Sequence, residues 1–206
     1  MMASVNTILG PIPADALGVT LIHEHLACGF PGWECDAVAA PYDRDAVVRV
    51  CVEALRQAKQ CGLRTLVGAT PMDLGRDVAL QKRVVIGHMC GNASLEYHIS
   101  VLDKGVYVAF DRFGVDAVFP DALRKACLIG LLGIGYARQI MLSHDYIAQI
   151  LGRPMAPPEV MRAALPNWSF THIFRNVIPA LRETGGSDDT IDTMMVENPR
   201  RLFAGG

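Results

Sequence analysis

The sequence lacks the features that mark membrane, secreted and nucleic-acid-binding proteins. No apolar run reaches the roughly 18 residues that a membrane-spanning helix needs. Residues 1–7 have neither the basic start nor the apolar centre of a secretory signal. The formal net charge of -2 gives no electrostatic reason to expect nucleic acid or an anionic surface as a partner. We therefore expect neither a membrane nor a nucleic acid among the partners.

Paired cysteines are missing as well. The chain has no Cys-x-x-Cys motif, and several of its cysteines fall inside segments with helix or strand patterns. This distribution favours reduced, mostly buried thiols in a cytoplasmic protein over a disulfide framework or a zinc site made of cysteines. The six cysteines are Cys28, Cys35, Cys51, Cys61, Cys90 and Cys127.

The composition that remains is that of a globular protein. Hydrophobic residues make up 51% of the 206 residues and charged residues 19%, a balance that supports a packed core and does not indicate disorder. No low-complexity linker or internal repeat divides the chain. We therefore expect a single domain over residues 1–206.

Alternating strand and helix patterns predict an α/β fold with a mainly parallel sheet and a helical C-terminal third. A helix capped by Asp43 or Asp45 and ended near Gly62 joins the first two strands, which makes a parallel unit with a crossover. The strands are expected at residues 16–22, 64–70, 83–88, 105–111 and 139–145. The later helices are expected at residues 93–104, 121–132, 157–164, 170–183 and 190–195.

Metal-capable or charged side chains follow most of these strands on the carboxyl side, the edge where parallel α/β proteins bind ligands. At the first strand, His23 and His25 are two residues apart and project to one face, whereas Glu24 points away. Two adjacent imidazoles suit zinc and related metals, although an isolated pair of histidines is often only hydrogen-bonded. Later strand ends supply His88, Asp111, Arg112, His144 and Asp145. His98 and His172 fall in helical stretches and are expected to be surface or packing residues.

The sequence resembles the phosphotriesterase family of the amidohydrolase superfamily, and most closely its lactonase-like members. The resemblance is carried by the His-Glu-His motif at residues 23–25, the Asp-Arg-Phe-Gly motif at residues 111–114 and the His-Asp pair at residues 144–145. Matching segments follow one another in the family's order over nearly the whole chain. They are residues 18–26, 69–77, 85–92, 110–114, 141–146, 174–182 and 198–203.

This resemblance implies a TIM-type (β/α) barrel with divalent metal at the carboxyl ends of its strands, most commonly zinc, with manganese or cobalt as alternatives. It implies that His23, His25 and Asp145 hold the more buried metal and His88 the more exposed one. The implied reaction is hydrolysis of a small-molecule ester, lactone or phosphotriester by a metal-activated hydroxide. Asp145 would also take a proton from the nucleophile. Arg112 resembles a residue on the substrate side, although an arginine paired with Asp111 or Asp116 is an equal alternative.

The chain also departs from the family pattern. Only five strands are expected where such a barrel has eight, and we expect the third to fifth barrel strands to be absent, with a junction near residues 83–85. The family's bridging lysine and a further histidine belong to the missing strands, and no lysine of this chain sits at the end of an expected strand. The fold expectation is therefore an incomplete barrel with one metal, leaving His88 as a lone ligand or a supporting residue. The four lysines are Lys59, Lys82, Lys104 and Lys125.

Three interpretations of function stay open. The chain is either a metal-dependent hydrolase that works with a reduced site, or a non-catalytic, metal-binding remnant of such an enzyme. A third is an open-sheet protein that binds an acidic metabolite at Arg112. An incomplete barrel also exposes two sheet edges, so the strands could reclose, two chains could pair their edges as a homodimer, or the chain could be poorly stable.

Overall fold

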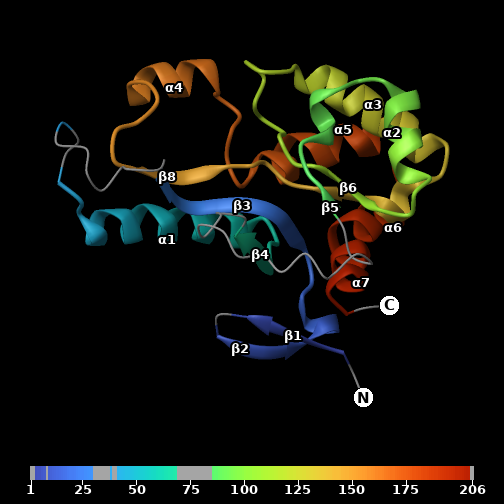
Figure 1. The fold of residues 1–206 in the computed structure, drawn as a ribbon, viewed down its shortest axis with the longest axis horizontal. Coiled ribbons are helices and arrows are strands. Elements are labelled where there is room, and N and C mark those ends of the chain that lie inside the picture. Colours follow the sequence, from blue (N-terminus) through green and yellow to red (C-terminus); the bar gives the residue numbers. More distant parts are fainter. Residues whose placement is uncertain (1–2, 8, 30–37, 39–40, 69–84, 205–206) are drawn as a thin grey trace.

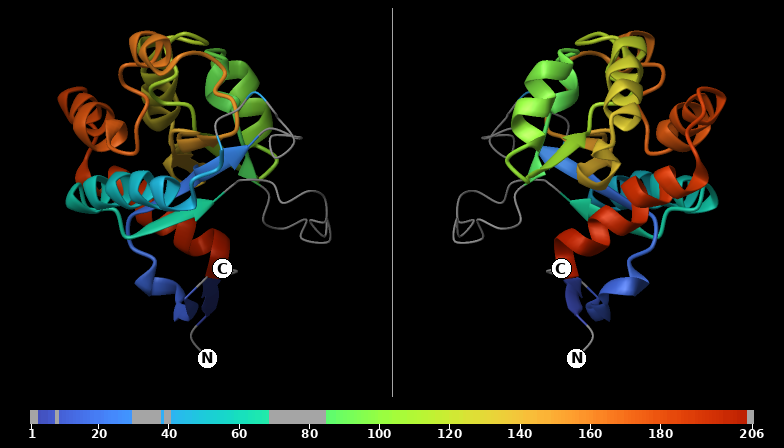
Figure 2. Two further views of the ribbon diagram at one scale, coloured as in Figure 1. Left: turned by 90° about the vertical axis from the view of Figure 1, so that its left-hand side faces the viewer. Right: turned by 90° about the vertical axis from the view of Figure 1, so that its right-hand side faces the viewer.

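The computed structural model describes residues 3–7, 9–29, 38, 41–68 and 85–204 (Figure 1). Helix α1 (Arg44–Gln60) lies along one side of the long strand β3 (Thr20–Gly29), whereas α2 (Leu95–Leu102) and α3 (Asp121–Gly133) lie together at the opposite end of the molecule. Figure 2 shows the same arrangement of helices and strands from the two sides. No helix of the described segments is long and apolar enough to cross a membrane.

The remaining elements are shorter than α1. The strands are β1 (Ser4–Thr7), β2 (Gly10–Pro13), β4 (Thr65–Gly68), β5 (Val85–Ile86), β6 (Tyr107–Phe110), β7 (Ile140–Leu142) and β8 (Ile147–Leu151). The helices and helical turns are η1 (Ala14–Ala16), η3 (Met89–Gly91), η4 (Tyr136–Gln139), α4 (Pro158–Ala164), η5 (Ile173–Val177), α5 (Ile178–Glu183), α6 (Asp188–Asp192), η6 (Thr193–Glu197) and α7 (Asn198–Ala204).

Two parallel three-stranded sheets form the centre of the fold. Their strand orders are β4-β3-β8 and β5-β6-β7. Residues 140–151 link the sheets, because β7 pairs with β6 and β8 pairs with β3. Between β7 and β8 the backbone keeps contact with both neighbours: the Ser143 amide donates to the Phe110 carbonyl, and the His25 amide donates to the Tyr146 carbonyl. The described strands therefore follow the order β4-β3-β8/β7-β6-β5.

The predicted α/β class with parallel strands is confirmed, and all five expected strands have a counterpart among the described residues. The first prediction was misplaced, because residues 14–16 form the turn η1 and the strand runs on through Gly29, so His23 and His25 lie within it. The prediction for residues 139–145 missed the second strand, β8, which begins after an irregular step. The hairpin of β1 and β2 was also missed.

The helix predictions are closer. Asp43 caps α1 by accepting a hydrogen bond from the Ala46 amide at 3.0 Å, and Gly62 follows the helix with a φ of 99° that glycine tolerates best. In the C-terminal third, two stretches expected to be regular α-helix contain the π-helical turns η5 and η6. Short-range patterns cannot resolve such a local change of winding.

His98 and His172 are packing residues, and neither lies on the surface, since both are buried. The His98 ring nitrogens face the carbonyl oxygens of Ser94 and Met89 at 2.8 and 3.1 Å. His172 donates to Asp121 at 2.7 Å. Each ring therefore stabilises the contact between helical segments.

Asp121 is the centre of a buried polar network at the start of α3. Its carboxylate accepts hydrogen bonds from Arg124 at 2.6 Å, from the Gly114 amide at 2.9 Å and from His172. Burial alone would raise the pKa of Asp121, but these donors outweigh it and lower the pKa. The network joins α3 to the segment that carries His172.

We expect Asp121→Asn to lower the free energy of unfolding by about 1–3 kcal/mol at pH 7, because buried donors lose their charged acceptor. The folded-state pKa of Asp121 lies below the unfolded value of about 3.9, so its contribution is complete above that pH and is lost as the pH falls through the folded value. Urea unfolding should therefore show the two proteins converging in acid. The exposed variant Asp192→Asn is the control, and a gap that stays constant with pH would contradict this account.

Candidate metal centre

Three ligand atoms converge where β3 meets the step between β7 and β8. The Nε2 atoms of His23 and His25 lie 3.4 and 3.1 Å from Oδ1 of Asp145, and one ligand atom of each residue lies within 4.8 Å of the others. Both histidines come from β3 and project to one face, as the period of a strand dictates. Two imidazole nitrogens and one carboxylate oxygen form a donor set that suits zinc with open coordination positions.

The carboxylate of Asp111 contacts this cluster through the ring of His23. The carboxylate is fully buried after β6, and its Oδ2 atom lies 3.1 Å from Nδ1 of His23. A histidine that binds a metal through one nitrogen usually donates the other N–H to such a carboxylate, which fixes the ring orientation. The residues present therefore fit a bound divalent ion.

His88 joins the same carboxylate from the next strand. Its amide donates to Asp111 at 2.8 Å, and its Nδ1 atom lies 3.3 Å from Asp111 Oδ1 and 3.9 Å from Asp145 Oδ2. The backbone can approach so closely because Gly87 has no side chain: a Cβ there would lie 2.9 Å from Asp111 Oδ2. His88 thus lies beside the three-atom cluster as a neighbour of Asp111.

The charges of the cluster reinforce one another. The hydrogen bond that His23 donates to Asp111 raises the pKa of His23 against the opposing effect of burial. Burial would raise the pKa of Asp111, but His23 and His88 hold it at about 2. Burial would likewise raise the pKa of Asp145, but His25, His23, His88 and Arg112 lower it. Both carboxylates are therefore kept charged beside the imidazoles.

Arg112 pairs with Asp145 and not with Asp111 or Asp116, the two partners considered from the sequence. Its Nε atom lies 3.3 Å from Asp145 Oδ2, the oxygen turned away from the two histidines of β3. The side chain of Arg112 is about one-third exposed, at 32%. It therefore lies at the solvent side of the cluster.

The structure brings most of the sequence-predicted site residues together and places His144 elsewhere. Four of them, namely His23, His25, His88 and Asp145, meet at one place with Arg112 at its edge. His144, grouped with them at a strand end, turns to the other face of the sheet and is fully buried against Glu24. Asp111 was recognised at a strand end but was considered only as a partner of Arg112.

Glu24 was expected to point away from the histidines, and it does, but its burial was missed. A carboxylate that alternates with two ligands on a strand must enter the layer behind the sheet, where it needs donors. That requirement was the signal available in the sequence. The structure supplies four donors, all from residues 143–146.

The lysines that the structure describes lie away from the cluster. Lys59 and Lys125 lie on α1 and α3, and Lys104 follows α2, whereas Lys82 lies outside the described residues.

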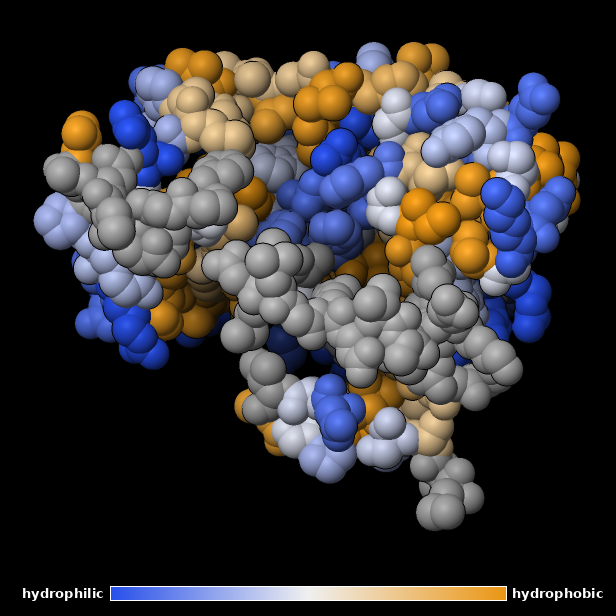
Figure 3. All heavy atoms as spheres, in the orientation of Figure 1, coloured by the Kyte–Doolittle hydropathy of each residue, from blue (hydrophilic) through white to orange (hydrophobic). Residues whose placement is uncertain are grey.

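The surface of the molecule is hollowed near the middle of the face that Figure 3 displays. Hydrophilic residues gather in this hollow, between the positions of β8 and β6 in Figure 1.

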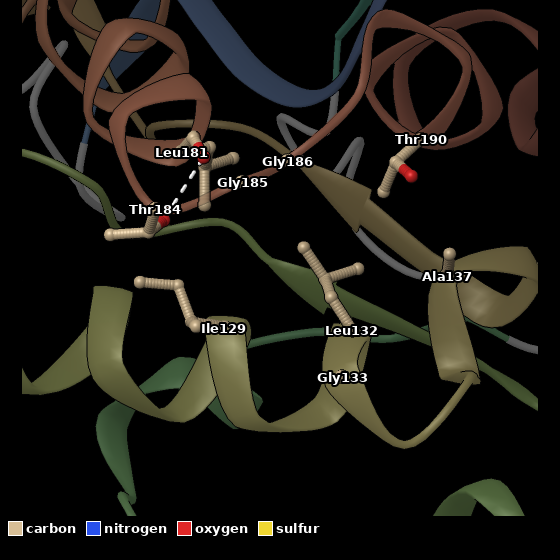
Figure 4. A pocket seen from close by; sticks show the side chains of 9 residues that line it. All are labelled: Ile129, Leu132, Gly133, Ala137, Leu181, Thr184, Gly185, Gly186 and Thr190. Carbon is tan, nitrogen blue, oxygen red and sulfur yellow. Dashed lines mark hydrogen bonds between the residues drawn. The ribbon is translucent and has the colours of Figure 1, made fainter.

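A separate cavity of about 210 Å³ lies between α3 and the turn after α5 (Figure 4). Apolar side chains and glycines from both elements line it, and Thr184 turns its hydroxyl back to the Leu181 carbonyl. None of the described residues that line this cavity has a titratable side chain. These residues therefore offer no group for acid–base chemistry.

Comparison with known proteins gives a family for this chain. The model of the phosphotriesterase family matches residues 3–84 and 79–203. A phosphotriesterase homology protein of Mycobacterium tuberculosis strain H37Rv is 38% identical over 121 residues, which are 59% of this chain and 36% of that protein. An aryldialkylphosphatase of Saccharolobus solfataricus is 34% identical over 122 residues, which are 59% of this chain and 38% of that protein. The chain spans little more than a third of the length of these curated relatives.

Solved structures agree with this result over the whole chain. An organophosphorus hydrolase from Deinococcus radiodurans superposes with a TM-score of 0.88 at 26% identity, covering 98% of this chain and 99% of that one. The family model, the curated relatives and the superposition thus point the same way. This chain belongs to the phosphotriesterase family.

Proposed function

We propose that this chain is a hydrolase that depends on one divalent metal, held by His23, His25 and Asp145. The observation that carries the proposal is the convergence of two imidazole nitrogens and a carboxylate oxygen, with Asp111 aligning His23. Zinc suits this donor set best, and manganese or cobalt are alternatives. Among the described residues, the His88 ring lies beside Asp111, Asp145 and the His23 ring and is not one of the three converging donors, so we assign it to support and not to a second metal.

A divalent ion held by these residues would lower the pKa of coordinated water towards ~7 and would polarise a carbonyl or phosphoryl oxygen. The chain's own residues would supply the rest. Asp145 has one oxygen at the histidines and the other at Arg112, so its charged carboxylate can accept a proton from the nucleophile. Arg112, at the solvent side, would orient the substrate's oxygen atoms.

The substrate class follows from the family and stays broad. One relative carries the name aryldialkylphosphatase, and the work on one superposed structure describes a weak promiscuous lactonase template. Both names describe hydrolysis at a carbonyl or phosphoryl centre. We therefore propose small esters, lactones or phosphotriesters as substrates of this chain.

A non-catalytic remnant is the second candidate, and the lysines favour it. None of the described lysines lies at a strand's carboxyl end, where the family's bridging ligand would sit. We also infer an internal deletion near residues 83–85, because the family model matches the chain as two overlapping segments. Such a deletion removes ligands together with strands.

Metal content separates the two candidates. We expect the parent to bind about one zinc per chain, because three converging donors suffice for a site with open positions. His23→Ala and Asp145→Ala should each abolish the binding, whereas His88→Ala should retain it. Elemental analysis of folded, dialysed protein measures this, and a parent without stoichiometric metal would leave the remnant interpretation in place.

Removal of the guanidinium tests the role of Arg112. We expect Arg112→Ala to lower kcat/KM for a lactone about 10- to 100-fold, the loss of one charge-assisted hydrogen bond, with metal content unchanged. The exposed variant Arg56→Ala should leave both quantities unchanged. A loss of metal in Arg112→Ala would show that the arginine acts on Asp145 and not on the substrate.

The outer edges of β4 and β5 have no sheet partner among the described residues. Unpaired edges favour strand pairing between molecules, so we propose that two chains associate through them. Light scattering during size-exclusion chromatography should give twice the mass of one chain at micromolar concentration. A single-chain mass over that concentration range would rule the association out.

A further inference from the structure

Glu24 accepts hydrogen bonds from the residues immediately before and after Asp145, one of the proposed metal ligands. The Glu24 carboxylate is fully buried on the face of β3 opposite to the imidazoles of His23 and His25. Its Oε1 atom accepts from the Ser143 hydroxyl at 3.0 Å, from the His144 amide at 2.9 Å and from His144 Nδ1 at 2.8 Å. Its Oε2 atom accepts from the Tyr146 amide at 2.9 Å.

Asp145 has a backbone conformation that requires such support. Its φ of 54° lies in the left-handed region, which residues other than glycine adopt at an energetic cost unless their surroundings enforce it. The Asp145 amide donates to the His23 carbonyl at 3.2 Å, which ties this unusual residue directly to β3. The bonds of Glu24 hold the residues immediately before and after it.

Ser143 extends the same support to His23. Its hydroxyl donates to Glu24 and accepts from the His23 amide at 2.9 Å, so one side chain connects the backbone of one ligand to the segment that carries the other. His144 is fixed as well, because its Nε2 atom accepts from the Ile173 amide at 3.0 Å. Nδ1 must then carry the proton that is donated to Glu24.

We propose that Glu24 is the positioning residue of the metal centre, holding residues 143–146 so that the Asp145 carboxylate meets the imidazoles of His23 and His25. Glu24 does not touch the metal and acts only through Asp145. This inference rests on the proposed metal site and adds the residue that sets its geometry.

Glu24→Gln tests the proposal, because it keeps the shape of the side chain and replaces one acceptor oxygen by a donor that faces another donor. We expect zinc to bind about 10- to 100-fold more weakly, the usual effect of losing a residue that orients a ligand. The visible absorption spectrum of the cobalt-loaded protein should also change, because Asp145 is no longer aligned. Amide hydrogen exchange should become faster at His144 and Tyr146.

Asp121→Asn is the matched control. It also changes a buried carboxylate with several donors, but those donors belong to α3 and its neighbours and not to the metal cluster. We expect it to lose stability while its zinc affinity and cobalt spectrum stay those of the parent. Equal weakening of zinc binding in both variants would reduce Glu24 to a structural residue and overturn the proposal.

Ser143→Ala keeps the test decisive if Glu24→Gln does not fold, because it removes one of the four bonds and the link to His23. It should weaken zinc binding about 2- to 10-fold. Parent-like zinc affinity in either folded variant overturns the proposal. If the parent binds no zinc, the proposed function is contradicted. In that case amide hydrogen exchange still tests Glu24: an unchanged exchange rate at His144 and Tyr146 in Glu24→Gln would show that Glu24 does not hold residues 143–146 in place.

Discussion

The centre of this structure depends on one stretch of chain that pairs with two different neighbours. Residues 140–151 run beside β6 first and beside β3 afterwards. The change of partner requires an irregular step, and Asp145 lies in that step with a left-handed backbone. Without the step, the two small sheets would not share an edge, and the carboxylate of Asp145 would not reach the imidazoles of β3.

The positions of β4, β6 and α1–α3 could be predicted because each depends on local features: an apolar run, a capping residue or a glycine after a helix. The continuation of β3 through residues 23–29 could not, because its polar residues fit a strand only when the partner β8 is in place. β8 was missed for the same reason. The end of β3 and the position of β8 are both decided by pairing between strands that are distant in sequence. Local strand propensity gives no information about such pairing.

The residues proposed as metal ligands could be selected from the sequence because catalytic α/β folds gather polar side chains towards the carboxyl ends of parallel strands. Their supporting carboxylates were harder to recognise. Asp111 and Glu24 are both fully buried, and burial of a charge is visible only when the donors around it are known. The pairing of Arg112 with Asp145 was missed because the two residues are 33 positions apart and meet only after β6 and β7 align.

The bare backbone at Gly87 limits how far the sequence around the centre can drift. A methyl group there would press on the Asp111 carboxylate and lie 3.5 Å from Nδ1 of His23. Asp111 has no room to retreat, since it is fully buried and already bonded to two histidines. A descendant of this chain could therefore keep all three proposed ligands and still disturb the proposed metal centre through the gain of a single carbon atom.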